Sequence, residues 1–219
     1  MIDSEDVRRR RARRVERILA DVYPDATCAL VHSSPFELLV ATVLSAQTTD
    51  VRVNQVTPEL FRRYPTPAAL AAASEDDVRE IVRPLGFWRR RATQLIQLAR
   101  ALEVDFDGQV PADRKALESL PGVGRKTAHV VLGNCFGVPA LTVDTHVGRL
   151  SRRLGLTEET APRKVEDDIA AVFTRKGKRT DWTVLCHRLI TLGREVCHSR
   201  GPDCGHCPLG GVCPRVGVA

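Results

Sequence analysis

Four cysteines near the end of the chain have the residue type and the spacing of metal ligands. Six, two and five residues separate Cys197, Cys204, Cys207 and Cys213. Thiolates this close together can enclose one zinc ion or one iron–sulfur cluster. Both alternatives stay open from the residues alone, because His198 or His206 could replace a thiolate in a zinc site. A broad visible absorbance band would indicate the iron–sulfur alternative.

A second candidate site is the segment Leu120-Pro121-Gly122-Val123-Gly124, which is too short and too rich in glycine for a helix. Helical patterns flank it, and its glycines allow the backbone to turn tightly. The helix that follows then presents free N–H groups, which commonly bind an anion. In a basic protein the expected anion is a DNA phosphate, and the plain alternative is a turn between two helices.

Lys126 lies in the first turn of the helix after this segment. An ordinary lysine with a pKa of about 10.4 is almost fully protonated near neutral pH and is a poor nucleophile. Burial, the charge of Arg125 and the positive end of the helix would each lower that pKa. A neutral amine can attack an electrophilic sugar carbon and form a Schiff base, whereas arginine cannot. The alternative role of Lys126 is a contact to phosphate.

Asp144 precedes a further predicted helix, in the segment Val143-Asp144-Thr145-His146-Val147-Gly148-Arg149. An N-cap is the commonest duty of an aspartate in this position. The functional alternative is a carboxylate that relays the proton of a lysine and stabilises positive charge on a sugar. The residues alone leave open whether Asp144 and Lys126 are neighbours.

Composition bounds the possible partners and the location. A net charge of +6 and a pI of about 9.2 favour a polyanionic partner. An aromatic content of 5% argues against binding of single strands by base stacking. The sequence has no apolar run long enough to cross a membrane and no secretory signal. We therefore expect a cytoplasmic, nucleoid-associated protein, with the arginines of residues 8–14 on a solvated helix face.

The pattern along the chain predicts an all-α fold. Ser34 and Pro35 have the residue types of an N-cap and a first helical position, and the apolar run behind them predicts a buried central helix. Ser74 with Asp77 resembles a capping box. Helices are expected over residues 5–22, 36–44, 88–103, 125–135, 145–154, 163–173 and 180–196, with shorter ones after Thr66, after Ser74 and before Ser119. No alternating strand pattern of useful length interrupts them.

Four parts of the sequence together resemble the endonuclease III family of DNA glycosylases. They are Leu44-Ser45-Ala46-Gln47-Thr48-Thr49-Asp50, the hairpin from Leu120 to Ala128, the segment from Val143 to Arg149, and the four cysteines with their highly specific spacing. The resemblance implies a base-excision repair glycosylase and abasic-site lyase that removes oxidised pyrimidines from duplex DNA. It also implies a helix-hairpin-helix fold, with a six-helix domain over residues 28–138 and an iron–sulfur domain over residues 1–27 and 139–219.

The same resemblance assigns roles to individual residues. Lys126 becomes the nucleophile, Asp144 the essential aspartate, and the four cysteines the ligands of a structural 4Fe-4S cluster. The damaged nucleotide would turn out of the stack into a pocket that holds Lys126 and Asp144, while Gln47 and Phe87 enter the duplex. Phe87 is larger than the aliphatic residue common in the family. Further DNA contacts are expected from Gly122, Val123, Gly124, Arg125, His146, Arg149 and Arg200.

Two other classes of protein remain as alternatives. A monofunctional mismatch or adenine glycosylase belongs to the same superfamily, but such enzymes typically lack a lysine at the position of Lys126. A non-catalytic iron–sulfur protein that binds DNA would use the hairpin and the cluster alone, and Lys126 and Asp144 would then be idle. We expect a monomer whose partner is double-stranded DNA.

Overall fold

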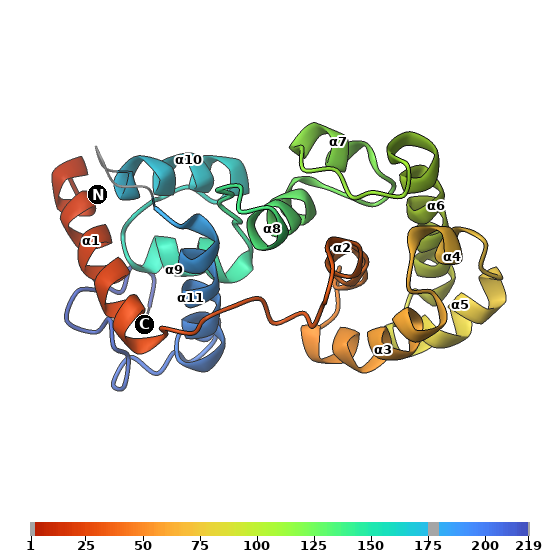
Figure 1. Ribbon diagram of the computed structural model, residues 1–219. Helices are drawn as coiled ribbons and strands as arrows, with labels where there is room; N and C mark the ends of the chain where they lie inside the picture. Colours follow the sequence, from red (N-terminus) through yellow and green to blue (C-terminus); the bar gives the residue numbers. More distant parts are fainter. Residues whose placement is uncertain (1–2, 175–179, 219) are drawn as a thin grey trace. The chain divides into compact units, whose positions relative to one another are not determined.

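The computed structural model describes residues 3–174 and 180–218 of the chain. In that part the regular structure consists of eleven α-helices and one short 3-10 helix without any strand, so the all-α prediction is confirmed (Figure 1). The chain divides into two compact units, Cys28–Val138 and Met1–Thr27 with Pro139–Ala219. None of the helices described is long and apolar enough to cross a membrane.

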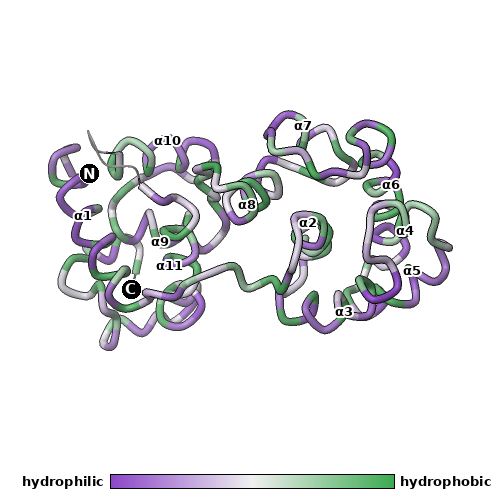
Figure 2. Tube along the Cα trace, in the orientation of Figure 1, coloured by the Kyte–Doolittle hydropathy of each residue, from purple (hydrophilic) through white to green (hydrophobic). Residues whose placement is uncertain are grey.

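The unit Cys28–Val138 is built around helix α2 (Pro35–Leu44). Helix α2 packs against α3 (Asp50–Arg63), α6 (Trp88–Phe106) and α8 (Arg125–Cys135). All its residues from Leu38 onward are buried, and Figure 2 shows it as a largely hydrophobic segment. The predicted buried central helix is therefore confirmed. The remaining elements of this unit are α4 (Pro67–Ala71), α5 (Glu75–Val82), the 3-10 helix η1 (Arg83–Leu85) and α7 (Arg114–Ser119).

Side-chain caps begin several helices of this unit. Ser34 accepts a hydrogen bond from the N–H of Glu37, as its position in the sequence predicts. The capping box predicted at Ser74 is wrong, because Ser74 makes no side-chain cap bond. Asp77 is one methylene shorter than the glutamate that this motif requires. The other acidic residues of that turn bind Arg79 instead.

One helix is missing from the sequence patterns, and another is longer than they predict. Helix α3 is not predicted by them, although Thr49 caps it by accepting from the N–H of Arg52. It carries Pro58 in its interior, a residue that usually interrupts a helical pattern. Helix α6 continues beyond the predicted end at residue 103 to Phe106, and it stops where Asp107 and the following glycine both adopt positive φ.

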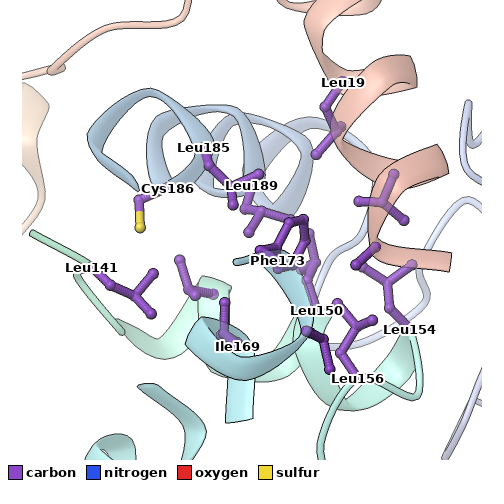
Figure 3. Packing of buried hydrophobic residues seen from close by; sticks show 14 of the residues in the cluster. Leu19, Leu141, Leu150, Leu154, Leu156, Ile169, Phe173, Leu185, Cys186 and Leu189 are labelled. Atoms are coloured by element: carbon purple, nitrogen blue, oxygen red, sulfur yellow. The ribbon is translucent and has the colours of Figure 1, made fainter. Parts of the chain in front are cut away.

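The other unit joins α1 (Glu5–Val22) to α9 (Thr145–Arg153), α10 (Pro162–Phe173) and α11 (Trp182–Glu195). Figure 3 shows leucines of α1, α9 and α11 meeting around Phe173 of α10. Leu209 belongs to this core, and it lies in the cysteine-rich segment, residues 197–213. Cys197, Cys207 and Cys213 pack against the same core. One hydrophobic core therefore fixes α9 and the cysteine-rich segment together.

Candidate functional site

The hairpin between α7 and α8 depends on Gly122 more than on Gly124. Gly122 has a φ of +80°, and a Cβ added there would lie 2.0 Å from the side-chain nitrogen of Gln94. Gly124 has a φ of −99°, and a Cβ there would meet nothing within 4 Å. The turn thus requires glycine at position 122, whereas Gly124 leaves the backbone open to approach. Val123 is buried and anchors the loop.

Helix α8 begins directly after this hairpin without a side-chain cap. Lys126 lies in its first turn and is exposed, so the burial that would favour a neutral amine is not found within its unit. Arg125 is half-buried beside it. The N–H groups of an uncapped first turn and the helix dipole favour a bound anion. The hairpin can therefore hold a phosphate close to the amine of Lys126.

Gln47 and Phe87 lie on two loops of the same unit, and both are exposed. Their φ angles are positive, 60° for Gln47 and 46° for Phe87, which is uncommon for residues that carry a Cβ. Phe87 is 70% exposed, a large apolar surface to leave in water. Uncommon backbone conformations of this kind concentrate at functional sites. The structure thus keeps both side chains available, and their entry into DNA stays a prediction.

Asp144 is the N-cap of α9 and belongs to the other unit from Lys126. Its Oδ1 accepts a hydrogen bond of 2.8 Å from the N–H of Val147. The capping role considered from the sequence is therefore confirmed. Capping uses one carboxylate oxygen, so the other is left for a functional contact. The catalytic role of Asp144 and its proximity to Lys126 stay predictions.

His146 and Arg149 are bonded within their own unit. The Arg149 guanidinium donates to the carbonyls of Gly193 at 2.8 Å and of Cys197 at 2.9 Å. It also lies 3.0 Å from Nδ1 of His146, and because arginine only donates, this nitrogen accepts and the ring is neutral. Burial lowers the pKa of His146, which also favours the neutral ring. Arg149 therefore fastens α9 to the end of α11, and its contact with DNA stays a prediction.

The four cysteines line one cavity. None of these four cysteines forms a disulfide in the part of the chain that the structure describes. Burial raises the pKa of Cys207 and of Cys213, and the charges of neighbouring cysteines raise both further. Thiolates in such a group need a compensating cation, which is the chemistry of a metal–sulfur site. Four cysteine thiolates are also the usual donor set of an iron–sulfur cluster. Their residue types therefore suit a cluster, and its binding stays a prediction.

Neither histidine of the zinc alternative lines this cavity. His206 lies against Asp203 instead, with its Nδ1 2.9 Å from Oδ2, and His198 is exposed. Among the residues that the structure describes, no group of three or more His, Cys, Asp and Glu side chains is arranged to hold a metal ion. Arg200, between the first two cysteines, is exposed, as a contact with DNA would require.

Arg153 holds both ends of the cysteine-rich segment. Its guanidinium donates to Sγ of Cys197 at 3.2 Å and to the carbonyl of His198 at 2.6 Å. Its own carbonyl accepts from the thiol of Cys213 at 3.3 Å. Hydrogen bonds of this kind orient ligands from outside the ligand set. The sequence analysis does not predict this role. Arg153 follows Arg149 by one helical turn, so the two arginines share a face of α9, and this spacing could have indicated a common partner.

Comparison with known proteins identifies the family. Residues 40–175 match the HhH-GPD superfamily base excision DNA repair protein. The chain is 46% identical to endonuclease III of Synechocystis sp. over 210 residues, which cover 95% of this chain and 94% of that protein. It is 40% identical to endonuclease III of Escherichia coli (strain K12) over 206 residues, with 93% and 95% covered.

A solved structure agrees with these relatives. The chain resembles a trapped endonuclease III–DNA covalent intermediate with a TM-score of 0.87 and 41% sequence identity. The similarity covers 94% of this chain and 96% of that one. The chain therefore belongs to the HhH-GPD superfamily of base excision DNA repair proteins and, within it, to the endonuclease III family, and it is a DNA glycosylase of base-excision repair.

Proposed function

We propose that this glycosylase removes oxidised pyrimidines from duplex DNA and then cleaves the abasic site through a Schiff base on Lys126. The observation that carries the proposal is the exposed amine of Lys126 in the first turn of α8, directly after a hairpin able to bind phosphate. An endonuclease III of similar structure has been trapped as a covalent intermediate with DNA, which supports a covalent mechanism.

The reaction proceeds in steps that conserve atoms and charge. The neutral amine of Lys126 attacks C1′ of the deoxyribose, and the bond from C1′ to the base breaks, with its electron pair leaving on the base. The sugar ring opens as the ring oxygen leaves C1′ and takes a proton, so that a Schiff base forms. Loss of a proton from C2′ expels the 3′ phosphate and nicks the strand. Water then hydrolyses the Schiff base and releases Lys126.

Asp144 handles protons and charge in this proposal. A carboxylate beside the reacting sugar takes up the amine proton and stabilises positive charge that develops at C1′. The cap bond to Val147 fixes one carboxylate oxygen and thereby orients the other. The same side chain thus begins a helix and takes part in the chemistry.

Four cysteines would hold a 4Fe-4S cluster of structural importance. When bound, the cluster supplies a link between four points of the segment from Cys197 to Cys213 and takes no part in base removal. Arg149 and Arg153 support the proposal, because both bond the carbonyl or sulfur of Cys197 from α9. Arg200 would then face the DNA backbone from a fixed loop.

The remaining predicted contacts complete the proposed complex with DNA. The hairpin from Gly122 to Arg125 binds the backbone without regard to sequence. Gln47 and Phe87 enter the duplex where the damaged nucleotide has left the stack. The protein acts as a monomer on the DNA of the bacterial nucleoid, in the cytoplasm.

Borohydride trapping tests the proposal. Duplex DNA with thymine glycol is mixed with wild-type protein, with Lys126→Ala, and with Lys115→Ala as a matched control, since Lys115 is an exposed lysine of α7 in the same unit. We expect a covalent adduct with the wild type and the control and none with Lys126→Ala. Base release without an adduct would place the protein among monofunctional glycosylases. Tight DNA binding with neither base release nor adduct would leave a different lesion or a non-catalytic role.

A further inference from the structure

Arg91 joins two loops that lie far apart in the sequence. It is in the first turn of α6, and it is only 6% exposed. Its Nε donates to the carbonyl of Gly86 at 2.8 Å, and its terminal nitrogens donate to the carbonyls of Leu44 at 2.6 Å and Ala46 at 2.8 Å. One guanidinium thus bonds the loop before α6 and the loop after α2.

This burial is costly, since a charged group loses its hydration. Burial accordingly lowers the pKa of Arg91. Within the part of the chain that the structure describes, its bonding partners are carbonyls and not carboxylates. Two of them lie at the C-terminal end of α2, where the helix dipole is negative. Removing the guanidinium would leave these carbonyls without their hydrogen-bond donor, so the arginine and the backbone of the two loops depend on each other.

Two of the three bonded carbonyls belong to the residues directly before Phe87 and Gln47, which are exposed and have positive φ. Gly86 precedes Phe87, and Ala46 precedes Gln47. Neither Phe87 nor Gln47 is held by burial of its own side chain, because both are exposed. The bonds from Arg91 therefore fix the backbones of the two residues relative to one another.

We propose that Arg91 is a positioning residue, which sets the separation of Gln47 and Phe87 so that both enter the duplex together as the damaged nucleotide leaves the stack. This inference rests on the proposed function of those two side chains. Arg91 does not contact the reacting sugar and acts only through them. Lysine does not replace it, because an ammonium group on a flexible stem cannot hold three carbonyls in the fixed geometry of a guanidinium.

The position of Arg91 in the sequence already indicates that its side chain is buried. Arg91 stands on the apolar face of α6, in helical register with Leu95, Leu98 and Leu102, all of which are buried. A charged residue in that register, with exposed Arg89 and Arg90 before it, indicates a buried cation with a specific partner.

The test compares wild-type protein with Arg91→Lys, and with Arg100→Lys as the matched control. Arg100 lies on the same helix, is exposed, and donates to the carbonyl of Ala71. The duplex substrate carries thymine glycol beside 2-aminopurine, whose fluorescence rises when a base loses its stacking. The second substrate is a single-stranded oligonucleotide with an abasic site, from which no base has to leave a duplex.

We expect Arg91→Lys to slow the fluorescence rise and base release on the duplex at least tenfold. Trapping on the single strand should stay within about twofold of wild type, because the amine of Lys126 is untouched. Arg100→Lys should match wild type in both assays. Phe87→Ala combined with Arg91→Lys should lose little more than either change alone, since residues that act through one another are not additive.

Equal duplex rates for Arg91→Lys and wild type would overturn the inference. An equal loss on both substrates would also overturn it, because that pattern reports general damage to the fold. Arg91→Gln, which removes the buried charge and keeps two donors, repeats the comparison if the lysine variant does not fold. If the wild type is trapped on neither substrate, the Schiff-base proposal is wrong. The fluorescence measurement would still decide the role of Arg91, because it does not depend on trapping.

Discussion

At the scale of single residues, Asp144 has a structural duty besides its proposed catalytic one, and the two duties can be tested separately. Asp144 caps α9 through a bond of 2.8 Å to the N–H of Val147. An aspartate that only caps can be replaced by asparagine, which is as good an N-cap. An aspartate that also supplies charge cannot. Substitutions at this position therefore distinguish the two duties.

We expect Asp144→Asn to keep the stability of the protein within a few tenths of a kcal/mol, because the cap survives. Base release should fall by a factor of about 100 or more, as expected for loss of a group that handles protons. Asp144→Ala should lose as much activity and also about 1 kcal/mol of stability. Single-turnover kinetics and denaturant unfolding measure the two effects.

Asp181→Asn is the control for this prediction. Asp181 caps α11 of the same unit by accepting from the N–H of Val184 at 3.1 Å. The same substitution there should leave both stability and base release near wild type. Full activity of Asp144→Asn would restrict Asp144 to capping.

At the scale of elements, α9 and α11 approach one another closely at Gly193. A Cβ added to Gly193 would lie 2.7 Å from Nδ1 of His146 and 3.1 Å from a terminal nitrogen of Arg149. The carbonyl of Gly193 also accepts a hydrogen bond from Arg149. Glycine is therefore needed at this crossing, even though it is a poor helix former. The crossing in turn positions the carbonyl of Cys197, which Arg149 also binds.

Gly193→Ala should destabilise the protein by up to about 2 kcal/mol. Overpacking costs about 1–3 kcal/mol, and better helix propensity recovers about 1 kcal/mol of it. Gly148→Ala on α9 is the matched control, because a Cβ there meets only ordinary contacts at 3.5 Å and beyond. It should leave stability unchanged or raise it by up to about 1 kcal/mol. Denaturant unfolding checks both, and equal effects would refute the close contact at Gly193.

At the scale of the whole molecule, the two units have separate sources of stability. The unit Cys28–Val138 is organised around buried α2. The other unit has one core to which Leu209 belongs and against which three of the four cysteines pack. A cluster bound by the cysteines would therefore stabilise mainly that unit.

Replacing one proposed ligand, in the variant Cys213→Ser, should lower the iron content and the visible absorbance of the purified protein. Amide hydrogen exchange should accelerate in α9, α11 and the cysteine-rich segment, while α2 and α6 keep their wild-type protection. Cys135→Ser, which alters a half-buried thiol of the other unit, is the control. Equal acceleration in both units would contradict a stabilising role confined to one.

Acid pH should weaken the same unit. Burial lowers the pKa of His187 below its ordinary value of 6.5, so the folded protein holds this residue neutral while the unfolded chain takes up a proton. Its contribution to stability is complete above pH 6.5 and is lost as the pH falls toward the folded pKa. His187→Gln should flatten the decline of the unfolding free energy below pH 6.5. The exposed His198→Gln should not, and identical pH profiles for the two variants would contradict the prediction.

Much of the fold and of the site follows from interactions that are local in the sequence. Ser34 with Glu37 and Thr66 with Ala69 are caps that reach three residues, so their residue types predict them directly. The cysteine spacing and the place of Lys126 behind its hairpin are local as well. Each of these features depends on residues only a few positions apart, so it can be predicted without knowing how the helices pack.

The contacts that hold the site in place depend on packing. Arg91 reaches carbonyls 45 and 47 residues away, and Arg149 reaches a carbonyl 48 residues away. The sequence alone shows Gly193 as an unfavourable residue inside a helix. The tertiary structure explains it, because the side chain of His146 leaves no room for a Cβ. Which side chain meets which backbone group at such separations depends on how helices cross, and helix crossings are set by the summed packing of the core.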